Sequence, residues 1–261
     1  MSKPEVKQVI IEENNYENNL TLMTYNVNFA ICNSDEEDDY NTKTSEVIKA
    51  ILESKADFIF IQESHKGFEN LLNTYLKKDY PNQYFKSPSD GWCASGIGVL
   101  SKHKIDVQYV KPSVEGSYFY GMIITYQDIQ FINVHLRPPM KMGNGSMIDF
   151  DHLKILFYES TIIHKNEIEY YIKKCDKEKI IILGDFNEDL TNWMKIKGYL
   201  NCLDKSKDRT TWYWPLFWGF QLWNSFDHIF LSKHFSCEVC RVGIEYKNVS
   251  DHIAVISTIK F

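Results

Sequence analysis

The sequence predicts one α/β domain made of two β/α halves. A β-α-β pattern occupies residues 20–63, and the apolar run 180–183, which ends at Gly184, is typical of a strand buried on both faces of a sheet. The chain has 261 residues, 44% of them hydrophobic, which is enough for a large core, and no repeat, low-complexity tract or linker divides it. We therefore expect residues 1–19 to form an N-terminal extension and residues 20–261 to form a single domain.

The first half is predicted from the spacing of its apolar residues. Its elements are a strand over 20–29, a helix over roughly 43–55, a strand over 57–63, and a second helix that starts near Phe68 and is stopped by Pro81. The acidic residues 33–41 are expected to form a solvated loop. Because crossovers between parallel strands are right-handed, Asn26 and Glu63 should lie at the same edge of neighbouring strands.

The second half is richer in strands. Strands are predicted over 96–105, 118–126, 129–136, 180–183, 225–232, 237–245 and 254–261, a loop over 87–95, a long helix from Met147 to about Lys174, and a short helix near 190–197. Two prolines, Pro138 and Pro139, end the strand before them and should hold Arg137 at the rim of the sheet.

The composition narrows the class of protein. A formal net charge of −6 and a pI near 5.8 lack the basic surplus of a tight, non-specific nucleic-acid binder, so a polyanionic substrate would need a local basic patch or a metal ion. There is no transmembrane segment, because no apolar run reaches about 18 residues, and the N-terminus has no signal-peptide pattern. We expect an intracellular protein, cytoplasmic or nuclear, that is a monomer.

The six cysteines are expected to be reduced thiols. Cys237 and Cys240 form a C-x-x-C pair, but no second pair of Cys or His residues has zinc spacing. On a regular strand these two side chains would point to opposite faces. We therefore interpret them as core thiols and not as a metal site.

Polar residues stand at the ends or starts of predicted strands in both halves. They are Asn26, Glu63, His135, Asp185, Asn187, Asp227, Asp251 and His252. For Asp185 and Asn187 the competing interpretation is an Asx-turn that only caps the backbone. As a set, carboxylate and amide oxygens without cysteine favour Mg²⁺ or Mn²⁺ over zinc, with a substrate phosphate completing the shell. A histidine next to aspartates also supplies a general base.

These residues lie in ordered motifs that span about residues 20–261. The motifs are TYNVN around Asn26, IQES around Glu63, GIGVLSKHKI over 96–105, NVHLRPP around His135, GDFN over 184–187, FDHIFLS over 226–232 and SDH over 250–252. The set resembles the endonuclease/exonuclease/phosphatase superfamily of deoxyribonuclease-I-like, metal-dependent phosphoesterases. The resemblance implies that residues 20–261 are a catalytic domain folded as a four-layer α/β/β/α sandwich, with two packed mixed sheets and helices on both outer faces.

The resemblance also implies a metal site and a base. Glu63 would be the main ligand of the Mg²⁺ or Mn²⁺ ion, with Asn26 and Asp251 nearby. His252, oriented by Asp227, would act as base on the attacking water or hydrogen-bond to the phosphorane.

Three further residues complete the catalytic set that the resemblance implies. Asp185 would position or deprotonate the nucleophile, while Asn187 and His135 would hold the phosphoryl oxygens. In-line attack on a phosphodiester needs charge neutralisation and a positioned water, which these residue types provide together with a metal.

Residues that bind the rest of the substrate are less specified by the sequence. Arg137 is either a phosphate clamp or an ordinary surface charge. The stretch 209–225 holds four of the six tryptophans, whose rings could stack on bases, insert shallowly into a membrane surface, or pack beneath a long loop as a satellite core. We favour the satellite core, with one or two rings, such as Trp212 and Trp223, lining the pocket.

The substrate class is predicted by exclusion of branches. An Arg soon after GDxN and a Trp-Cys-Asp-Arg run, usual in inositol-polyphosphate 5-phosphatases, are missing, as is the Trp-Arg pair of abasic-site endonucleases. We expect hydrolysis of a phosphoester in nucleic acid or a nucleic-acid adduct, by a nuclease or a tyrosyl-DNA-phosphodiesterase-like enzyme. The alternatives are a sphingomyelinase- or phosphatase-like enzyme acting on lipid or inositol phosphates, and a non-catalytic phosphate-binding module.

Overall fold

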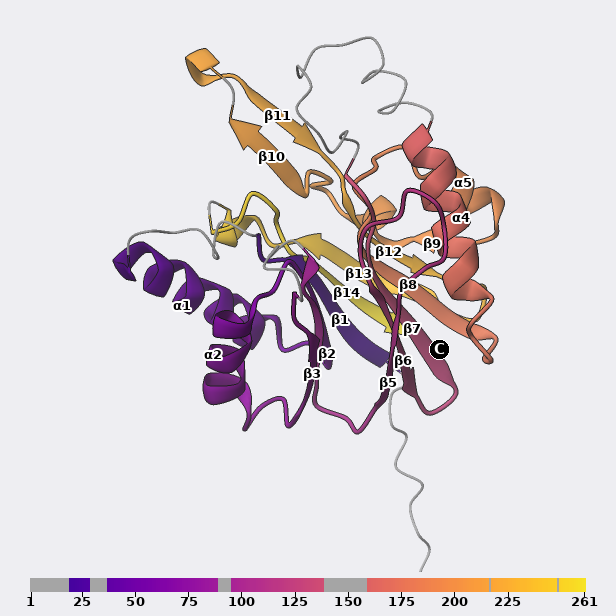
Figure 1. The fold of residues 1–261 in the computed structure, drawn as a ribbon, viewed down its shortest axis with the longest axis horizontal. Helices are drawn as coiled ribbons and strands as arrows, with labels where there is room; N and C mark the ends of the chain where they lie inside the picture. Colours follow the sequence, from indigo (N-terminus) through magenta and orange to yellow (C-terminus); the bar gives the residue numbers. More distant parts are fainter. Residues whose placement is uncertain (1–18, 29–36, 89–94, 139–158, 216, 248) are drawn as a thin grey trace, which may run out of the picture.

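Two six-stranded sheets pack face to face in this computed structural model, and helices cover their outer faces (Figure 1). The structure describes residues 19–28, 37–88, 95–138, 159–215, 217–247 and 249–261. The order of layers is helix, sheet, sheet, helix, so the predicted four-layer α/β/β/α sandwich is confirmed. Within the described residues, no helix is long and apolar enough to cross a membrane.

The first sheet has the order β13-β14-β1-β2-β4-β3. Its strands are β1 (Asn19–Asn26), β2 (Phe58–Gln62), β3 (Asn82–Lys86), β4 (Ile97–Ser101), β13 (Ser236–Val242) and β14 (Val255–Lys260). Strands β1 and β2 pair in parallel with Asn26 opposite Gln62, and Glu63 follows directly. The expectation that Asn26 and Glu63 leave the sheet at one edge is therefore confirmed.

The second sheet has the order β5-β6-β7-β8-β12-β9. Its strands are β5 (Asp106–Val110), β6 (Gly121–Tyr126), β7 (Ile129–His135), β8 (Lys179–Asp185), β9 (Leu200–Asn201) and β12 (Asp227–Leu231). Strand β8 pairs in parallel with β7, where His135 faces Asp185, and antiparallel with β12, where Asp227 faces Asp185. Three neighbouring strands thus bring His135, Asp185 and Asp227 into one row at the strand ends on one side of the sheet.

In the described part of the chain, two pairs of helices cover the outer faces. Helices α1 (Glu37–Ser54) and α2 (Lys66–Leu76) lie on the first sheet, while α4 (Ser160–Ile172) and α5 (Asn192–Ile196) lie on the second (Figure 1). Single 3-10 turns occur at Cys202–Lys205, Phe217–Gly219 and Ile244–Tyr246. The main core lies between the sheets, where Phe58 and Phe60 of β2 pack against Phe131 of β7. Burial of such rings, each worth on the order of 2 kcal/mol, fixes the sheet edges relative to each other.

The helix predicted over 43–55 starts earlier than expected. Residues 37–41, expected in the acidic loop, form the first turns of α1. The charge run therefore does not indicate a loop over its whole length. Residues 1–18 and 147–158, which include most of the predicted extension and the start of the predicted long helix, lie outside the described residues.

Strands β3 and β5 were not predicted. Both lie at sheet edges, where most side chains of β3 are partly buried and most of those of β5 are exposed. Because a half-buried edge strand carries little apolar alternation, its sequence lacks the pattern that identified the central strands.

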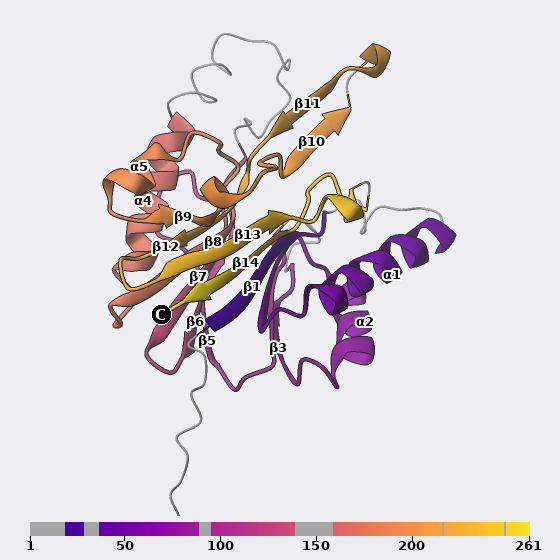
Figure 2. The same ribbon diagram turned by 180° about the vertical axis from the view of Figure 1, so that it is seen from behind.

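The stretch 209–225 is not a loop. It forms an antiparallel hairpin of β10 (Trp212–Pro215) and β11 (Gln221–Asn224), which extends away from both sheets (Figures 1 and 2). We call residues 212–224 the aromatic hairpin. The favoured interpretation, a satellite core under a loop, is wrong, because Trp214, Phe220 and Trp223 are exposed.

The cysteine pair is also arranged differently from the expectation. Strand β13 has a register shift between Cys237 and Val239, which adds one residue to this side of the ladder. Cys237 and Cys240 therefore point to the same face, and both are buried in the core between the sheets. The prediction of opposite faces was wrong, whereas their interpretation as core thiols holds.

Candidate functional site

Polar side chains from both sheets meet at one end of the sandwich. Asn26 ends β1, Asp185 ends β8 and Asp227 begins β12, and all three are fully buried. Glu63 follows β2 with a positive φ of 58°. For a non-glycine residue this conformation is uncommon and costs on the order of 1 kcal/mol or more, and such residues are concentrated at functional sites.

Asn26 links the two sheets. Its Nδ2 donates to Oε1 of Glu63 at 3.1 Å and to Oδ2 of Asp185 at 2.8 Å, and it lies 3.4 Å from Nε2 of His252. Its Oδ1 accepts a hydrogen bond from the backbone N of Asn28. In this structure the amide nitrogen therefore bridges the carboxylates, while the oxygen caps the chain that leaves β1. The sequence-based role of Asn26 as a metal ligand stays a prediction.

His252 forms a buried pair with Asp227. The distance between His252 Nδ1 and Asp227 Oδ2 is 2.8 Å, and His252 Nε2 lies 3.6 Å from Asp185 Oδ2. Burial lowers the pKa of His252, but the carboxylates of Asp227 and Asp185 outweigh this effect and raise the pKa well above its usual value. The imidazole is thus oriented by Asp227 and directed toward Asp185.

Asp185 is at the centre of the cluster. Its Oδ1 accepts from the backbone N of Asn187 at 2.8 Å, which fixes the turn after β8. The pKa of Asp185 is raised to about 7, mainly by burial and also by Asp227, against the opposing effects of His252 and Asn26. An Asx-turn is therefore present, but it exists together with contacts to His252 and Asn26 that a simple cap would not need.

Within the described part of the chain, two groups of ligand atoms lie close enough to hold a cation. One consists of Glu63, His135 and Asp185, and the other of Asp185, Asp227 and His252. His135 Nε2 is 3.6 Å from both Glu63 Oε1 and Asp185 Oδ2, and its ring stacks on Phe119 at 4.1 Å. The first group therefore joins two carboxylates and one imidazole.

The exposure of Glu63 and the hydrogen bond within the second group favour the first group as the metal centre. The side chain of Glu63 is 14% exposed, so solvent and substrate can reach this group through Glu63. Such access is needed if a substrate phosphate is to complete the coordination shell of the cation. In the second group, His252 and Asp227 are already hydrogen-bonded to each other. Two carboxylates and one imidazole can together hold a divalent cation, and this donor set does not specify which one.

Asn187 and Asp251 lie at the rim of the cluster. Asn187 has a positive φ of 49°, and its Nδ2 donates to the backbone O of Leu136 at 2.9 Å, which joins the turns after β7 and β8. Asp251 Oδ2 accepts from Trp212 Nε1 at 3.2 Å. The structure thus brings Trp212 to the site and places the Asp251 carboxylate against the indole.

Arg137 and Trp223 are not in this cluster. The guanidinium of Arg137 lies over the Tyr118 ring at 4.7 Å and donates to the backbone O of Gly116 at 3.3 Å. Trp223 is on the exposed strand β11 of the aromatic hairpin, opposite Tyr213. Their contact with substrate remains a prediction.

Three residues that position the site were not singled out from the sequence. Thr211 Oγ1 accepts from the backbone N of both Phe226 and Asp227 at 2.9 Å, and Ser250 Oγ, donating to Asn26 O, accepts from His252 N. The third is Phe119, under His135. Ser250 stands inside the SDH motif, which is a usable signal, whereas nothing in the sequence around Phe119 indicated its role.

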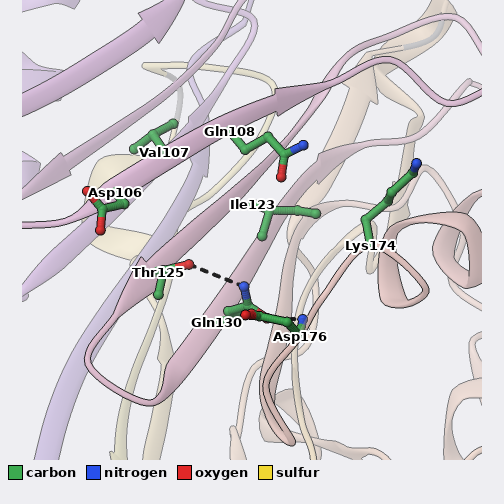
Figure 3. Close-up of a pocket in the computed structure, with 8 residues that line it drawn as sticks. All are labelled: Asp106, Val107, Gln108, Ile123, Thr125, Gln130, Lys174 and Asp176. Carbon is green, nitrogen blue, oxygen red and sulfur yellow. Dashed lines mark hydrogen bonds between the residues drawn. The ribbon is translucent and has the colours of Figure 1, made fainter.

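The pocket in Figure 3 lies elsewhere. It has a volume of about 320 Å³ and is lined by side chains that include Gln108, Gln130 and Lys174. Gln130 is near the start of β7, whereas His135 ends that strand. Its amide oxygen is used to accept from the backbone N of Asp176 and Lys177. We therefore assign no chemistry to this pocket.

Comparison with known proteins agrees with the geometry. A sequence model of the Endonuclease/Exonuclease/phosphatase family matches residues 23–252. No curated protein matches the chain significantly. A solved family protein from Leptotrichia buccalis C-1013-b is 20% identical, with a TM-score of 0.63 and coverage of 93% of this chain and 100% of the other.

Two structures of D. rerio TDP2 share the fold as well. A humanized form with 14 mutations is 14% identical, with a TM-score of 0.65 over 94% of this chain and 100% of the other. The complex with a single-strand DNA product is 15% identical, with a TM-score of 0.62 over 93% of this chain and 99% of the other. At these identities the likeness concerns the fold.

Proposed function

The chain belongs to the endonuclease/exonuclease/phosphatase family, and from this membership we propose that it is a divalent-metal-dependent phosphodiesterase. It hydrolyses, by attack of water, a phosphodiester of nucleic acid or of a nucleic-acid adduct. The observation that carries the proposal is the shared carboxylate of Asp185. It lies 3.6 Å from His135 in the group suited to a cation and 3.6 Å from His252 in the buried pair with Asp227.

One ring nitrogen of His252 and one carboxylate oxygen of Asp185 can contact the same water molecule. His252 Nε2 and Asp185 Oδ2 are 3.6 Å apart, which lets one water oxygen contact both. The water oxygen forms a new bond to phosphorus while the ester bond on the opposite side breaks. The proton of the water passes to Asp185 or His252, and the leaving oxygen acquires a proton from solvent.

The remaining residues stabilise charge and hold the substrate. Glu63, His135 and Asp185 would hold the cation, which when bound neutralises charge that develops on the phosphoryl oxygens. Asn187 and, once protonated, His252 are donors at the same edge and can bind those oxygens. Asp227 orients His252 and stabilises its charged form.

Nucleic acid is the first candidate substrate. It is supported by the TDP2 structure that contains a single-strand DNA product and has the same fold. The second candidate is a lipid phosphodiester. It is supported by the aromatic hairpin, whose root contacts Asp251 through Trp212 and whose exposed rings carry no charge.

A substrate panel tests both candidates. Wild type, Glu63→Ala and His252→Ala are assayed with single-stranded and 5′-blocked oligonucleotides, phosphocholine lipids and inositol phosphates, in Mg²⁺, in Mn²⁺ and in chelator. We expect oligonucleotide hydrolysis that disappears in chelator and falls by at least about 100-fold in both variants. Tyr75→Ala, an exposed residue on α2, is the matched control and should keep wild-type activity.

Other outcomes contradict specific parts of the proposal. Unchanged activity in Glu63→Ala and His252→Ala would refute the site. Hydrolysis of phosphocholine lipids without nuclease activity would replace the first candidate by the second. Tight substrate binding with no turnover in either metal would indicate a non-catalytic phosphate-binding module.

A further inference from the structure

We infer that the aromatic hairpin docks the protein on the interface of a zwitterionic phospholipid bilayer. The hairpin, residues 212–224, extends beyond both sheets in the two opposite views (Figures 1 and 2). This surface role goes beyond the proposed chemistry, because it concerns where the protein binds and does not require any particular substrate.

Apolar side chains are exposed on both faces of the hairpin and near its tip. Trp214 and Leu222 are paired on one face, Trp223 is on the other face, and all three are exposed. Near the tip, Trp218 is 89% exposed and Phe220 is 66% exposed. Docking on a flat protein surface would need an apolar face on one side of the hairpin. Exposed rings on both faces and near the tip instead suit insertion into the interface of a bilayer, which contacts the hairpin on all sides.

The charge distribution also favours a bilayer interface. Between Thr210 and Ser225 the sequence has no Asp, Glu, Lys, Arg or His. Among the described residues, two cations lie near the root of the hairpin: Lys247 is over the Tyr213 ring at 5.1 Å, and Arg209 pairs with Asp204 at 2.5 Å. Trp and Tyr favour the headgroup region of a bilayer, and binding grows with the apolar area inserted.

Nucleic acid fits this surface less well. Non-specific binding of nucleic acid is dominated by Lys and Arg contacts to phosphate, and single-strand grooves combine such cations with stacking rings. The hairpin offers the rings without the cations. The net charge of −6 likewise disfavours a strongly anionic membrane, so we commit to a zwitterionic one.

The root of the hairpin is joined to the candidate site. Trp212 Nε1 donates to Asp251 Oδ2 at 3.2 Å, and the Trp212 ring is stacked with Trp214, the two centroids being 6.4 Å apart. The backbone N of Tyr213 donates to Asp251 O, and that of Ile253 donates to Thr211 O. The hairpin that would bind the bilayer is therefore connected at its root to Asp251 and Ile253, on either side of His252.

Vesicle binding by the full chain, with divalent metal chelated so that no hydrolysis interferes, tests the inference. The test variant is Trp218→Asn, Phe220→Ser and Trp223→Thr combined. Asn tolerates the positive φ of 59° at position 218, and Thr keeps strand propensity at position 223. Tyr75→Ala is the matched control, because Tyr75 is 64% exposed, close to the 65% of Trp223, and lies on α2.

We expect wild type and Tyr75→Ala to co-sediment with phosphatidylcholine vesicles, and the triple variant to bind at least about tenfold more weakly. Brominated lipid should quench the fluorescence of wild type, since four of the six tryptophans lie in the hairpin. Thermal unfolding of the triple variant, compared with wild type and Tyr75→Ala, shows whether it is folded, and hydrolysis of a small soluble phosphodiester by wild type reports on the proposed function separately.

Three results would overturn the inference. Wild type could fail to bind phosphatidylcholine vesicles. Binding could occur only when phosphatidylserine is present and be unchanged in the triple variant, which would indicate simple electrostatic attraction. The triple variant could instead lose binding to a single-stranded oligonucleotide, or lose self-association, which would assign the hairpin to nucleic acid or to a second copy of the chain.

Discussion

Nδ1 of His252 lies 2.8 Å from Oδ2 of Asp227, and both side chains are buried. The pair joins the two sheets, since Asp227 begins β12 and His252 precedes β14. Asp227 is itself held by Thr211, whose hydroxyl accepts from its backbone N. The other oxygen of Asp227, Oδ1, is buried without a hydrogen-bond partner among the described residues. A buried carboxylate oxygen without a partner costs stability. This cost is consistent with a role in which the negative charge of Asp227 stabilises the charged imidazole of His252.

The first prediction concerns this pair. Asp227→Asn keeps the shape of the side chain but removes the charge that orients and stabilises the imidazolium, so kcat should fall by about 100- to 10,000-fold with little change in KM. Steady-state kinetics on a small phosphodiester measure both constants. Asp189→Asn, an exposed aspartate after β8, serves as control. A kcat for Asp227→Asn equal to wild type would refute the role of the pair.

The second prediction concerns the cation. Glu63→Ala should weaken Mn²⁺ binding by at least about tenfold, the loss expected even for an outer-shell partner of a metal. Asp251→Asn should weaken it less, because the Asp251 carboxylate accepts from Trp212 Nε1 and lies outside the group formed by Glu63, His135 and Asp185. Free Mn²⁺ measured by electron paramagnetic resonance reports binding without turnover. A larger loss in Asp251→Asn than in Glu63→Ala would show that Asp251 is the main ligand.

The core of the fold was predictable because its central strands are apolar runs. Residues 180–183 are fully apolar because β8 is covered on both faces, and the β-α-β unit placed Asn26 next to Glu63. Edge strands β3 and β5 lack that pattern. The orientation of Cys237 and Cys240 depends on a bulge, and a bulge is set by pairing between strands distant in sequence.

The site was predictable at the level of residue types and strand ends, but not at the level of contacts. That Asn26 presents its nitrogen to Asp185, or that Phe119 stacks on His135, depends on the packing of the two sheets. The exposure of the hairpin was missed because rings usually lie inside a fold, and no local pattern separates a buried aromatic loop from a projecting one.

The third prediction concerns Glu188, which follows Asn187. Its carboxylate accepts from Thr161 Oγ1 at 2.6 Å and lies 2.8 Å from His164 Nδ1, and His164 Nε2 lies 2.9 Å from Arg137 O. Helix α4 thereby holds together the turns after β7 and β8. Glu188→Ala should lower kcat by about tenfold at nearly constant KM, because Asn187 loses its fixed position.

A double-mutant cycle tests whether Glu188 acts through this contact. The effects of Glu188→Ala and His164→Ala on kcat should be clearly less than additive, since the two residues share one interaction. Asp189→Asn is again the matched control. Additive effects, or a loss of thermal stability that accounts for the whole fall in activity, would reduce Glu188 to a structural residue.

The fourth prediction concerns Glu167, which is buried in α4. Among the described residues, its carboxyl accepts a single hydrogen bond, from Tyr171 OH to Oε1 at 3.4 Å. Burial raises the pKa of Glu167 from 4.5 to about 8, so the folded chain keeps a proton that the unfolded chain releases. Between these two pKa values the unfolded state binds fewer protons, and stability must fall as pH rises. The shift corresponds to a loss on the order of 5 kcal/mol across this window.

Glu167→Gln keeps the size of the side chain and cannot ionise, so its free energy of unfolding should fall less than that of wild type between about pH 5 and about pH 9. Chemical denaturation at both pH values measures the difference, and subtraction of the two profiles removes groups that titrate in both proteins. Glu169→Gln is the matched control, because Glu169 is a surface residue paired with Lys197 at 2.5 Å, which lowers the pKa of its carboxyl. Parallel profiles for wild type and Glu167→Gln would mean that Glu167 is ionised in the folded protein at neutral pH.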